Sequence, residues 1–549
     1  MKEKKEEIEQ KSAEELAKEL KQVSVSAFFE RNRHLLGYDN PSKALLTVVK
    51  ELVDNLVDAC EDARILPEGV VIIKQLNETR FLITVEDNGP GIVKENLPSV
   101  FCSLLYGSKF GKNKQSRGLQ GIGASGAVLY SQLTTGKPVK VWSKTAKDKK
   151  MHFYEMFIDV HKNQAEIKKE ETLDTTKAHG VKVELEIEAR YQKGKQGVDE
   201  YLIQTSITNP HLQLSYVNPN NEKIIFKRAS NNLPKEPKAI KPHPHGTELG
   251  VLMRMLKESK SRNLQSFLMN DFCRIGSGTA QEIITKALLT VNDKPHNLMH
   301  DQAEKLYKSM QEAKVIAPPT DCLSPIGEKD FLKSVQSEIK AEFYTSVTRS
   351  PTVYRGYPFQ IECSLAAFGE LNPEESIKVM RFANRVPLLY QQSACATIEA
   401  IKETNWRAYG LQQSSGNLPI GPVILAVHIA SVWVPFTSEA KEAIAHYPEI
   451  IKEIKLAVQE CGRRLGIYIR KNVRAREQKE KASLFEKYIP ELASSLSEIT
   501  KENKNKLIEA LNKRLKKDLP LLIEVSEEDK DKKIEGVVVQ NKNDKQTTL

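Results

Sequence analysis

The chain has 549 residues, of which 40% are hydrophobic and 28% are charged, and its formal net charge is +10. This length predicts roughly three or four folded domains, and the composition is typical of folded proteins with sizeable cores. No apolar stretch reaches about 18 residues without a charged side chain, so the sequence predicts no membrane span. The N-terminal segment MKEKKEEIEQKSAEELAKEL contains no apolar core of the kind that defines a secretory signal.

The seven cysteines are scattered along the chain without any C-x-x-C pair. This spacing favours reduced thiols in a cytosolic protein over a disulfide framework or a zinc site. The positive net charge is compatible with a nucleic-acid partner, although charge alone does not distinguish such proteins from other mildly basic ones.

The first part of the chain alternates helical and strand patterns. Residues before Val23 are strongly charged and predict a solvated helix. From Pro41 to Leu56 apolar residues recur at three- and four-residue spacing, which predicts an amphipathic helix. A loop rich in glycine and lysine and then a second helix are expected at 107–126 and 127–133. Segments rich in β-branched and aromatic residues predict strands at 80–87, 137–144, 153–160 and 180–191.

The second part of the chain begins after a stretch punctuated by proline and glycine, IKPHPHGTELGVL. The residues that follow, to about Lys286, predict helices, and a third unit begins beyond VIAPPTDCLSPIGE. Its expected strands are 357–369 and 422–435, and a long helix is predicted after Pro448. The tail from about Glu524 is polar and charged, which predicts disorder.

The stretch RGLQGIGASGAVLYS contains a G-x-G-x-x-G pattern at Gly121, Gly123 and Gly126. A Rossmann fingerprint requires a strand directly before the first glycine, but here the preceding residues are a polar, basic loop. No G-x-x-x-x-G-K-[ST] motif exists, so a P-loop is excluded as well. The remaining interpretation is a flexible glycine loop that leads into a helix N-terminus, which suits phosphate.

Two further segments carry side chains suited to nucleotide chemistry. Glu51 and Asn55 lie one turn apart on the first predicted helix, where a carboxylate base and an amide ligand for Mg²⁺ could act together. Asp87 ends a predicted strand and is followed by Gly89 and Gly91, so a carboxylate could bind an exocyclic amine while backbone approaches a flat ring. Alone, the Glu51 and Asn55 pair is equally consistent with a polar helix surface. For Asp87 alone, a plain Asp-Asn-Gly turn is the better interpretation.

Taken in order, these segments resemble the N, G1 and G2 boxes of the GHKL ATPases, which include gyrase B, heat-shock protein 90, MutL and sensor histidine kinases. The boxes are Glu51 with Asn55, then Asp87-x-Gly89-x-Gly91, then Gly118-x-x-Gly121-x-Gly123. The resemblance implies an α+β or α/β multidomain protein with a Bergerat fold, in which ATP lies between helices and a mobile lid.

Longer segments resemble the B subunits of archaeal-type topoisomerase VI. They are FFERNRHLLGYDNPSKALLTVVKELVDNLVDA, YGSKF, RGLQGIGASGAVLYSQLTTGKPVKV, RFANRVPLLY and VPFTSEAKEAIA. This resemblance covers about residues 25 to 480 and implies a helix-two-turns-helix insert and a transducer domain, similar to ribosomal S5 domain 2, that ends in a long helix. The expected divisions are a charged extension (1–24), the ATPase domain (25–240), the insert (241–312) and the transducer (313–485). A helical, disordered tail (486–549) is expected to contact the topoisomerase VI A subunit.

The resemblance also implies roles for individual residues. Glu51 would be the general base, Asn55 the Mg²⁺ ligand and Asp87 the partner of the adenine amine. Ser108 and Lys109 would lie in the lid, and the triphosphate would be wrapped by Gly118, Leu119, Gln120, Gly121, Ile122, Gly123, Ala124 and Ser125. Lys441, from a distant segment, would contact the γ-phosphate. One departure concerns Val181, which stands where GHKL proteins usually have threonine; valine cannot support the adenine-binding water, so ATP affinity is expected to fall.

The resemblance implies an ATP- and Mg²⁺-dependent subunit that dimerises on ATP binding and captures double-stranded DNA. It would assemble with DNA-cleaving A subunits in an A2B2 heterotetramer, in the cytoplasm and associated with the nucleoid. A histidine-kinase-type phosphotransferase is disfavoured because the only histidine upstream of Glu51 is His34, which has no neighbouring carboxylate partner in sequence. A MutL-like repair ATPase is disfavoured by the insert, and a scaffold without turnover by Glu51.

Overall fold

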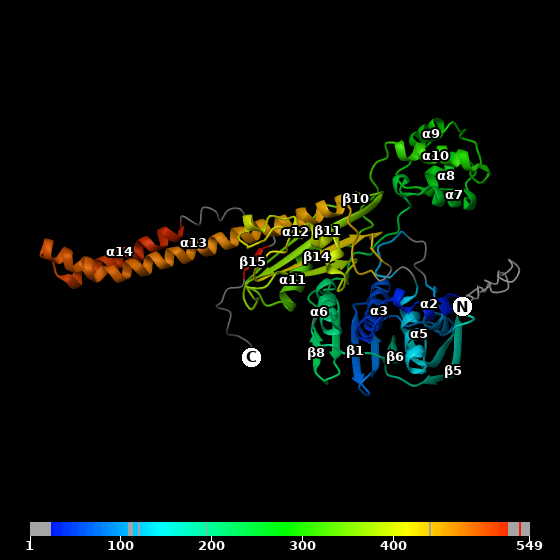
Figure 1. Ribbon diagram of the computed structural model, residues 1–549, viewed down its shortest axis with the longest axis horizontal. Helices are drawn as coiled ribbons and strands as arrows, with labels where there is room; N and C mark the ends of the chain where they lie inside the picture. Colours follow the sequence, from blue (N-terminus) through cyan, green and yellow to red (C-terminus); the bar gives the residue numbers. More distant parts are fainter. Residues whose placement is uncertain are drawn as a thin grey trace, which may run out of the picture. The chain divides into compact units, whose positions relative to one another are not determined.

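A computed structural model of the protein describes residues 24–107, 113–118, 121–194, 196–438, 441–524 and 537–539. The chain divides into two compact units. Unit 1 comprises residues up to Phe110, Gly118–Asp199 and Gln213–Ile225, and unit 2 comprises Gly111–Arg117, Glu200–Leu212 and the chain from Phe226. Figure 1 labels the elements of both units. The charged segment before Val23 and most of the predicted tail beyond Glu524 lie outside the described residues.

Unit 1 is built on an eight-stranded sheet with the order β5-β4-β3-β6-β2-β1-β7-β8. Neighbouring strands from β5 to β1 pair antiparallel, whereas β1 and β7 are parallel. A parallel Rossmann sheet is therefore excluded, as the sequence indicated. The strands are β1 Glu68–Gln75, β2 Arg80–Asp87, β3 Val139–Lys144, β4 Met151–Asp159, β5 Gln164–Leu173, β6 Gly180–Glu188, β7 Gln213–Val217 and β8 Lys223–Phe226.

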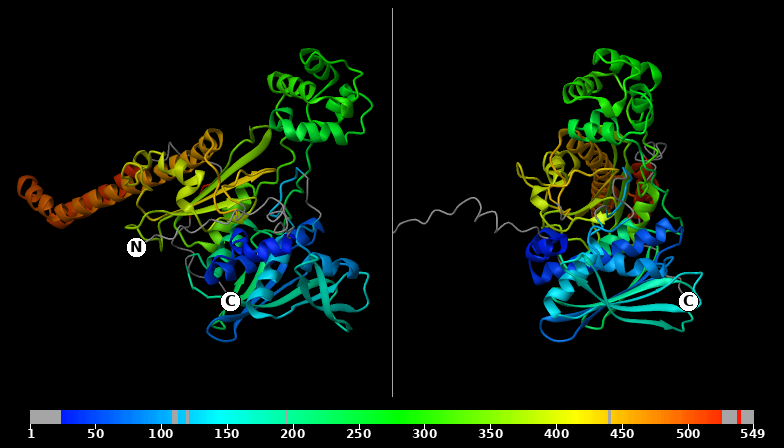
Figure 2. Two further views of the ribbon diagram at one scale, coloured as in Figure 1. Left: turned by 45° about the vertical axis from the view of Figure 1, so that its right-hand side comes forward. Right: turned by 90° about the vertical axis from the view of Figure 1, so that its right-hand side faces the viewer.

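Helices cover one face of this sheet, as Figure 2 shows for the blue and cyan segments. The longest is α3 (Pro41–Asp62), which begins with an Asn40 cap and a proline in its first turn and buries its apolar stripe. It packs against β1, β2 and α5 (Gly123–Thr135). The prediction of an amphipathic helix from Pro41 is thus confirmed. The smaller helical elements are α2 Val25–Arg31, η1 Arg33–Leu36, η2 Lys94–Asn96 and α4 Leu97–Cys102.

Unit 2 contains a second mixed sheet with the order β13-β12-β14-β11-β9-β15, to which β10 adds by pairing with β11. Its strands are β9 Phe343–Thr348, β10 Thr352–Tyr354, β11 Tyr357–Ala367, β12 Lys378–Ala383, β13 Val386–Pro387, β14 Val423–Ser431 and β15 Val537–Val539. Both strands predicted for this part of the sequence, β11 and β14, are confirmed and pair antiparallel with each other. They are almost entirely buried because helices α11 and α13 also pack on this sheet.

The predicted helical insert has a hydrophobic core of its own, formed by side chains such as Leu252, Phe267, Ile283 and Leu306. Its elements are η3 Pro244–Gly246, α7 Leu249–Glu258, α8 Leu264–Asp271, α9 Ser277–Lys286, η4 Pro295–Asn297 and α10 His300–Glu312.

The remaining helices of unit 2 are α6 Val198–Thr208, which begins in unit 1, and α11 Glu328–Glu338, η5 Gln392–Ala394, α12 Ala396–Lys402, η6 Trp406–Tyr409, α13 Pro448–Thr500 and α14 Lys504–Glu524. The predicted long helix is α13, which has 53 residues and contains Pro490. Its first turns are buried on the sheet, and α14 packs along it. All seven cysteines are free thiols. Among the described residues, no helix is both long and apolar enough to cross a membrane.

Candidate active site

The predicted base, Glu51, projects from α3 toward the start of α5. A Cβ atom added to Gly123 would overlap with the Glu51 carboxylate oxygen Oε2. The backbone of Gly123 and the carboxylate of Glu51 are therefore in close approach, which only glycine allows. The other oxygen, Oε1, lies 3.3 Å from Nζ of Lys50. Two residues that the sequence placed in separate boxes, 72 positions apart by their numbers, thus meet in unit 1.

The glycine loop leads into a helix N-terminus, as predicted, but α5 already begins at Gly123, within the segment expected to be a loop to residue 126. Gly121 has a left-handed φ of +61°, and Ile122 is the residue that precedes the first turn of α5. The backbone N–H groups of the first turn have no partner within the helix and favour an anion. Ser125 is buried, and its hydroxyl donates to the Ile122 carbonyl at 3.2 Å. Ala124 is also buried at this helix start.

Asp87 is held by two backbone N–H groups on one of its oxygens. Oδ1 accepts from Gly89 N at 2.8 Å and from Val181 N at 2.9 Å. No described residue donates to Oδ2. Burial raises the pKa of Asp87, and the two backbone hydrogen bonds together with nearby His179 partly oppose that rise. The carboxylate is therefore oriented by the fold with one oxygen left to accept a further donor.

The register between β2 and β6 explains why Val181 contributes. Glu86 pairs with Lys182, which places Asp87 beside Val181 at the start of β6. Gly180 has φ +134°, and a Cβ atom there would overlap with the Asp87 carbonyl oxygen. The contribution of Val181 comes from its backbone, and sequence reasoning missed it because it considered only the side chain. The glycine directly before Val181 is the signal that could have revealed a close backbone approach.

The turn after Asp87 is fixed on both sides. Asn88 accepts from Glu68 N at 2.8 Å and donates to the Leu66 carbonyl at 3.0 Å. Gly91 has φ +77°, and a Cβ atom there would overlap with the Lys144 carbonyl. Both glycines of this box therefore serve close approaches, since a Cβ atom on Gly89 would lie 3.0 Å from Asp87 Oδ1. A side chain at either position would therefore displace the turn that follows Asp87.

Two further predicted site residues are Asn55 and Gly118. Asn55 is exposed on α3, one turn beyond Glu51. A Cβ atom on Gly118 would meet nothing within 4 Å, so this glycine borders open space. Ser108, Lys109, Leu119 and Gln120 lie outside the described residues.

The distant lysine, Lys441, belongs to unit 2 and lies in a loop between β14 and α13. Its Nζ donates to the carbonyl oxygen of Arg117 at 3.1 Å. Arg117 is the residue directly before Gly118. The structure thus brings Lys441 to the peptide bond that precedes Gly118.

Comparison with known proteins gives consistent results for both units. Residues 40–162 match the family described as "Histidine kinase-, DNA gyrase B-, and HSP90-like ATPase", and residues 318–481 match "Topoisomerase VI B subunit, transducer". The 43K ATPase domain of Thermus thermophilus gyrase B, solved with an aminocoumarin, is similar over 84% of this chain and 98% of that chain. Its TM-score of 0.37 and identity of 14% are too low to add to these matches.

Several named relatives are similar to most of the chain. The chain is 48% identical to the type 2 DNA topoisomerase 6 B subunit of Methanococcoides burtonii, over 88% of this chain and 78% of that protein. It is 46% identical to the protein of the same name from Archaeoglobus fulgidus, over 87% of this chain and 79% of that protein. It is 36% identical to the protein of the same name from Pyrococcus furiosus, over 90% of this chain and 95% of that protein.

Proposed function

Because the chain belongs to the family of type 2 DNA topoisomerase 6 B subunits, we propose that Glu51, Asp87 and the start of α5 form the ATP site through which it works. It is the ATPase component of a type II DNA topoisomerase. The observation that carries the assignment is the close approach of Glu51 to Gly123. A carboxylate beside a phosphate-binding helix N-terminus is a suitable arrangement for hydrolysis.

The residues present fit an adenine nucleotide. Asp87 has its Oδ1 fixed by backbone N–H groups, and its Oδ2 would accept the exocyclic amine of adenine. A desolvated acceptor of this kind discriminates strongly, because a base lacking the amine would leave it unpaired. The glycines around Asp87 allow the backbone to approach a flat ring. Val181 offers its backbone to Asp87 but no hydroxyl, so the expected loss of ATP affinity stays a prediction.

The phosphate end of the site would be formed by the start of α5 and by Glu51. ATP supplies the phosphoanhydride bond that is broken, and Glu51 would take the proton from the attacking water. Asn55 would hold Mg²⁺ together with phosphate oxygens and water, since Mg²⁺ usually takes only one or two protein ligands at such sites. The described residues contain no group of three His, Cys, Asp or Glu side chains able to hold a metal, so this ion would arrive with the nucleotide.

Lys441 would sense the terminal phosphate. Its hydrogen bond to the Arg117 carbonyl places its ammonium at the peptide that leads into the glycine loop. A compact ammonium is suited to a phosphate as a point charge. Since the interaction with phosphate would end when phosphate leaves, Lys441 would bias a conformational equilibrium according to nucleotide state.

We further propose that the protein works with DNA-cleaving A subunits in an A2B2 heterotetramer and that ATP binding dimerises its B subunits around double-stranded DNA. The named relatives are B subunits, which supports an A-subunit partner. The DNA contacts would include Lys257, Lys260, Arg262, Arg470 and Arg474, all of which are at least partly exposed.

A single experiment tests the ATP site. The full chain would be combined with its DNA-cleaving partner. ATP binding, ATP hydrolysis and decatenation would then be measured for the wild type, Glu51→Gln and Asp87→Ala. We expect Glu51→Gln to bind ATP but to hydrolyse it about 10²–10⁴-fold more slowly, and Asp87→Ala to bind ATP about 10–100-fold more weakly. Normal hydrolysis by Glu51→Gln would refute the site.

A further inference from the structure

The five residues that precede Gly118 form a segment that we call the arm, Asn113–Arg117. The chain passes from unit 2 to unit 1 at the Arg117–Gly118 peptide bond. The arm itself belongs to unit 2, although it lies in the middle of the ATPase sequence. Whatever fastens the arm therefore fastens the beginning of the glycine loop to the transducer.

Gln115 fastens the arm through both ends of its side-chain amide. Its Nε2 donates to the Ser324 carbonyl at 3.0 Å, and its Oε1 accepts from Ser324 N at 2.8 Å. Both residues are buried, and they are 209 positions apart in the sequence. The side-chain amide of Gln115 thus makes two hydrogen bonds with the backbone of Ser324, as a residue of a neighbouring β-strand would. A buried pair of this kind is costly to break, because the polar groups of Ser324 would lose their partner.

The rest of the arm is held by further contacts. The Asn113 carbonyl accepts from Ile240 N at 2.9 Å, and the Ser116 carbonyl accepts from Asn384 Nδ2 at 3.2 Å. The buried guanidinium of Arg117 donates to Asn209 Oδ1 at 2.6 Å. Together with Gln115 these contacts connect the arm to four separate segments of unit 2.

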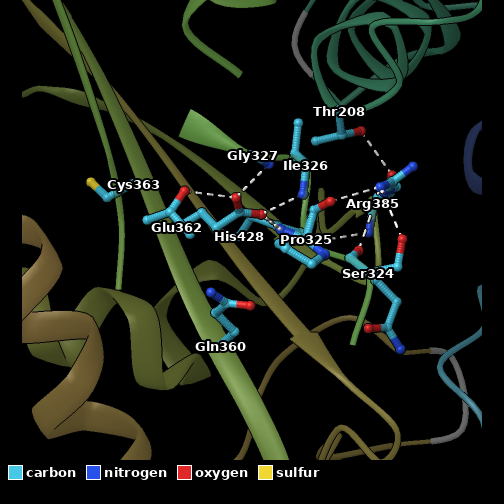
Figure 3. A network of polar contacts seen from close by, with 12 residues as sticks. Thr208, Ser324, Pro325, Ile326, Gly327, Gln360, Glu362, Cys363, Arg385 and His428 are labelled. Carbon is cyan, nitrogen blue, oxygen red and sulfur yellow. Dashed lines mark hydrogen bonds and ion pairs between the residues drawn. The ribbon is translucent and has the colours of Figure 1, made fainter. Parts of the chain in front are cut away.

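Behind Ser324 lies a buried polar network that ties the transducer strands together (Figure 3). Arg385 donates its Nη2 to the Ser324 hydroxyl at 3.3 Å and to the Pro325 carbonyl at 2.9 Å. The backbone N–H of Arg385 donates to Nε2 of His428, whose Nδ1 lies 2.8 Å from Glu362 Oε2. Glu362 in turn accepts from the backbone N–H groups that follow Pro325.

This network fixes the position of Ser324, to which Gln115 of the arm is hydrogen-bonded. Glu362 lies on β11, His428 on β14, and Arg385 in the turn between β12 and β13. The side chains of Glu362 and His428 are fully buried. A satisfied polar network in the interior specifies one arrangement and resists distortion. A displacement of Gln115 would therefore be carried to the strands of the sheet rather than absorbed by a surface loop.

We propose that Gln115 is a positioning residue that couples nucleotide state to the transducer, by fastening the arm before Gly118 to the backbone of Ser324. The inference rests on the proposed ATP site, because the glycine loop must respond to nucleotide. Gln115 would act through the arm rather than by contact with nucleotide or DNA. Its role is to ensure that a shift of the loop start moves Ser324 and the strands behind it.

The test is Gln115→Met in the full chain, assembled with its DNA-cleaving partner. Methionine keeps the length and volume of glutamine but makes no hydrogen bonds to the Ser324 backbone. The matched control is Gln132→Met. Gln132, on α5, makes the same double contact with the backbone of Ile158, at 3.0 and 2.8 Å, but entirely within unit 1. For each protein, ATP binding, DNA-stimulated hydrolysis and DNA strand passage are measured.

We expect Gln115→Met to bind ATP and to lower the number of strand passages per ATP hydrolysed by about tenfold, within the usual range of coupling between sites. The ratio should stay near the wild-type value in Gln132→Met. A wild-type ratio in Gln115→Met would overturn the inference. An equal fall of the ratio in both variants would also overturn it, because the effect would then reflect general destabilisation.

Hydrogen exchange gives a second readout that does not depend on strand passage. In the wild type, a non-hydrolysable ATP analogue should change the protection of peptides around Ser324 and Arg385. In Gln115→Met the change should be confined to unit 1. Unchanged protection around Ser324 in the wild type would contradict the coupling. Normal hydrolysis by Glu51→Gln would instead refute the ATP site, so the two failures are distinguishable.

Discussion

The Nζ atom of Lys441 lies 3.1 Å from the carbonyl oxygen of Arg117, although the two residues are 324 positions apart. The lysine thus donates to a neutral backbone oxygen at the entrance to the glycine loop. A terminal phosphate is a stronger acceptor for an ammonium than a neutral carbonyl. An exchange of Lys441 from the carbonyl to phosphate would give the nucleotide a direct influence on the loop between β14 and α13.

Replacing Lys441 should separate nucleotide binding from strand passage. We expect Lys441→Ala to bind ATP, to hydrolyse it poorly, and to fail in decatenation with an intact DNA-cleaving partner, because the charge that distinguishes ATP from ADP is removed. ATP and ADP should also give more similar scattering profiles in the variant than in the wild type. Wild-type decatenation by Lys441→Ala would return this lysine to a surface role.

Replacing Glu51 should affect chemistry rather than affinity. We expect Glu51→Gln to hydrolyse ATP about 10²–10⁴-fold more slowly, since a positioned base is removed while the shape of the side chain is kept. Steady-state hydrolysis and calorimetric ATP binding would be compared with Glu61→Gln, a control on the same helix α3. If both variants turned over at the same rate, Glu51 would not be the base.

Replacing Asp87 should affect affinity. Residue type alone predicts a milder effect for Asn than for Ala, because the amide keeps an oxygen. However, Oδ1 already accepts from two backbone N–H groups, so the amide nitrogen of Asn would take the place of Oδ2 and face the adenine amine. We therefore expect both variants to weaken ATP binding by about 10–100-fold. Equal binding of ATP by the wild type and Asp87→Ala, measured by calorimetry, would remove Asp87 from the site.

The exposed basic residues should set the salt dependence of DNA binding. Lys257, Lys260, Arg262, Arg470 and Arg474 make no ion pair with any described residue. Each phosphate interaction that charge reversal removes should flatten the plot of log K against log salt by about 0.9. The control is Arg476→Glu, because Arg476 is already paired with Glu480 at 2.9 Å. An unchanged affinity and slope after reversal of all five charges would exclude these residues from the DNA interface.

Acid should weaken the transducer through its buried pair. Burial lowers the pKa of His428, which the neighbouring Glu362 only partly offsets. For Glu362, burial favours the neutral acid, but the hydrogen bonds from His428, Ile326 N and Gly327 N hold its pKa below the ordinary value. Both groups therefore take up protons more readily in the unfolded chain than in the folded one. The free energy of unfolding should fall as the pH drops below about 6.5, where the histidine of the unfolded chain is protonated, and again near about 4.3, where its glutamate is protonated.

The expected result is a lower unfolding midpoint in urea at pH 5.5 than at pH 7.5. The difference should shrink in His428→Gln, which removes the imidazole, and persist in His161→Gln, which removes an exposed one. An undiminished pH effect in His428→Gln would assign it to other groups.

Sequence reasoning located the elements whose patterns are strong and local. The spacing of apolar residues after Pro41 identified α3, and the Gly121–Gly126 pattern identified a loop that leads into α5. Among the strands that were not predicted are β1 and β5. Residues 164–173 of β5 are largely exposed and charged, so they lack the apolar signal of a strand. Long-range pairing with β4 holds them extended instead.

The candidate site could be predicted only as far as side chains define it. Glu51 and Asp87 were predicted as site residues because carboxylates in such contexts suggest chemistry, and their roles stay predictions. The backbone N–H of Val181 and the double contact of Gln115 were not predicted, since both depend on tertiary register that no local pattern encodes. The assignment of the arm to unit 2 was likewise outside the reach of the sequence, which placed these residues within one ATPase domain.

The length of helix α13 determines how far its end would move when the sheet rotates. Its 53 residues correspond to a rod about 80 Å long. Its buried side chains from Ile450 to Leu465 are clamped to the sheet, and about 50 Å extends beyond them. Packing by α14 supports this helix, in which Pro490 leaves one backbone hydrogen bond unmade. A tilt of about 10° at the packed end would move the far end by roughly 9 Å, so a small rotation of the sheet would be enlarged along the helix.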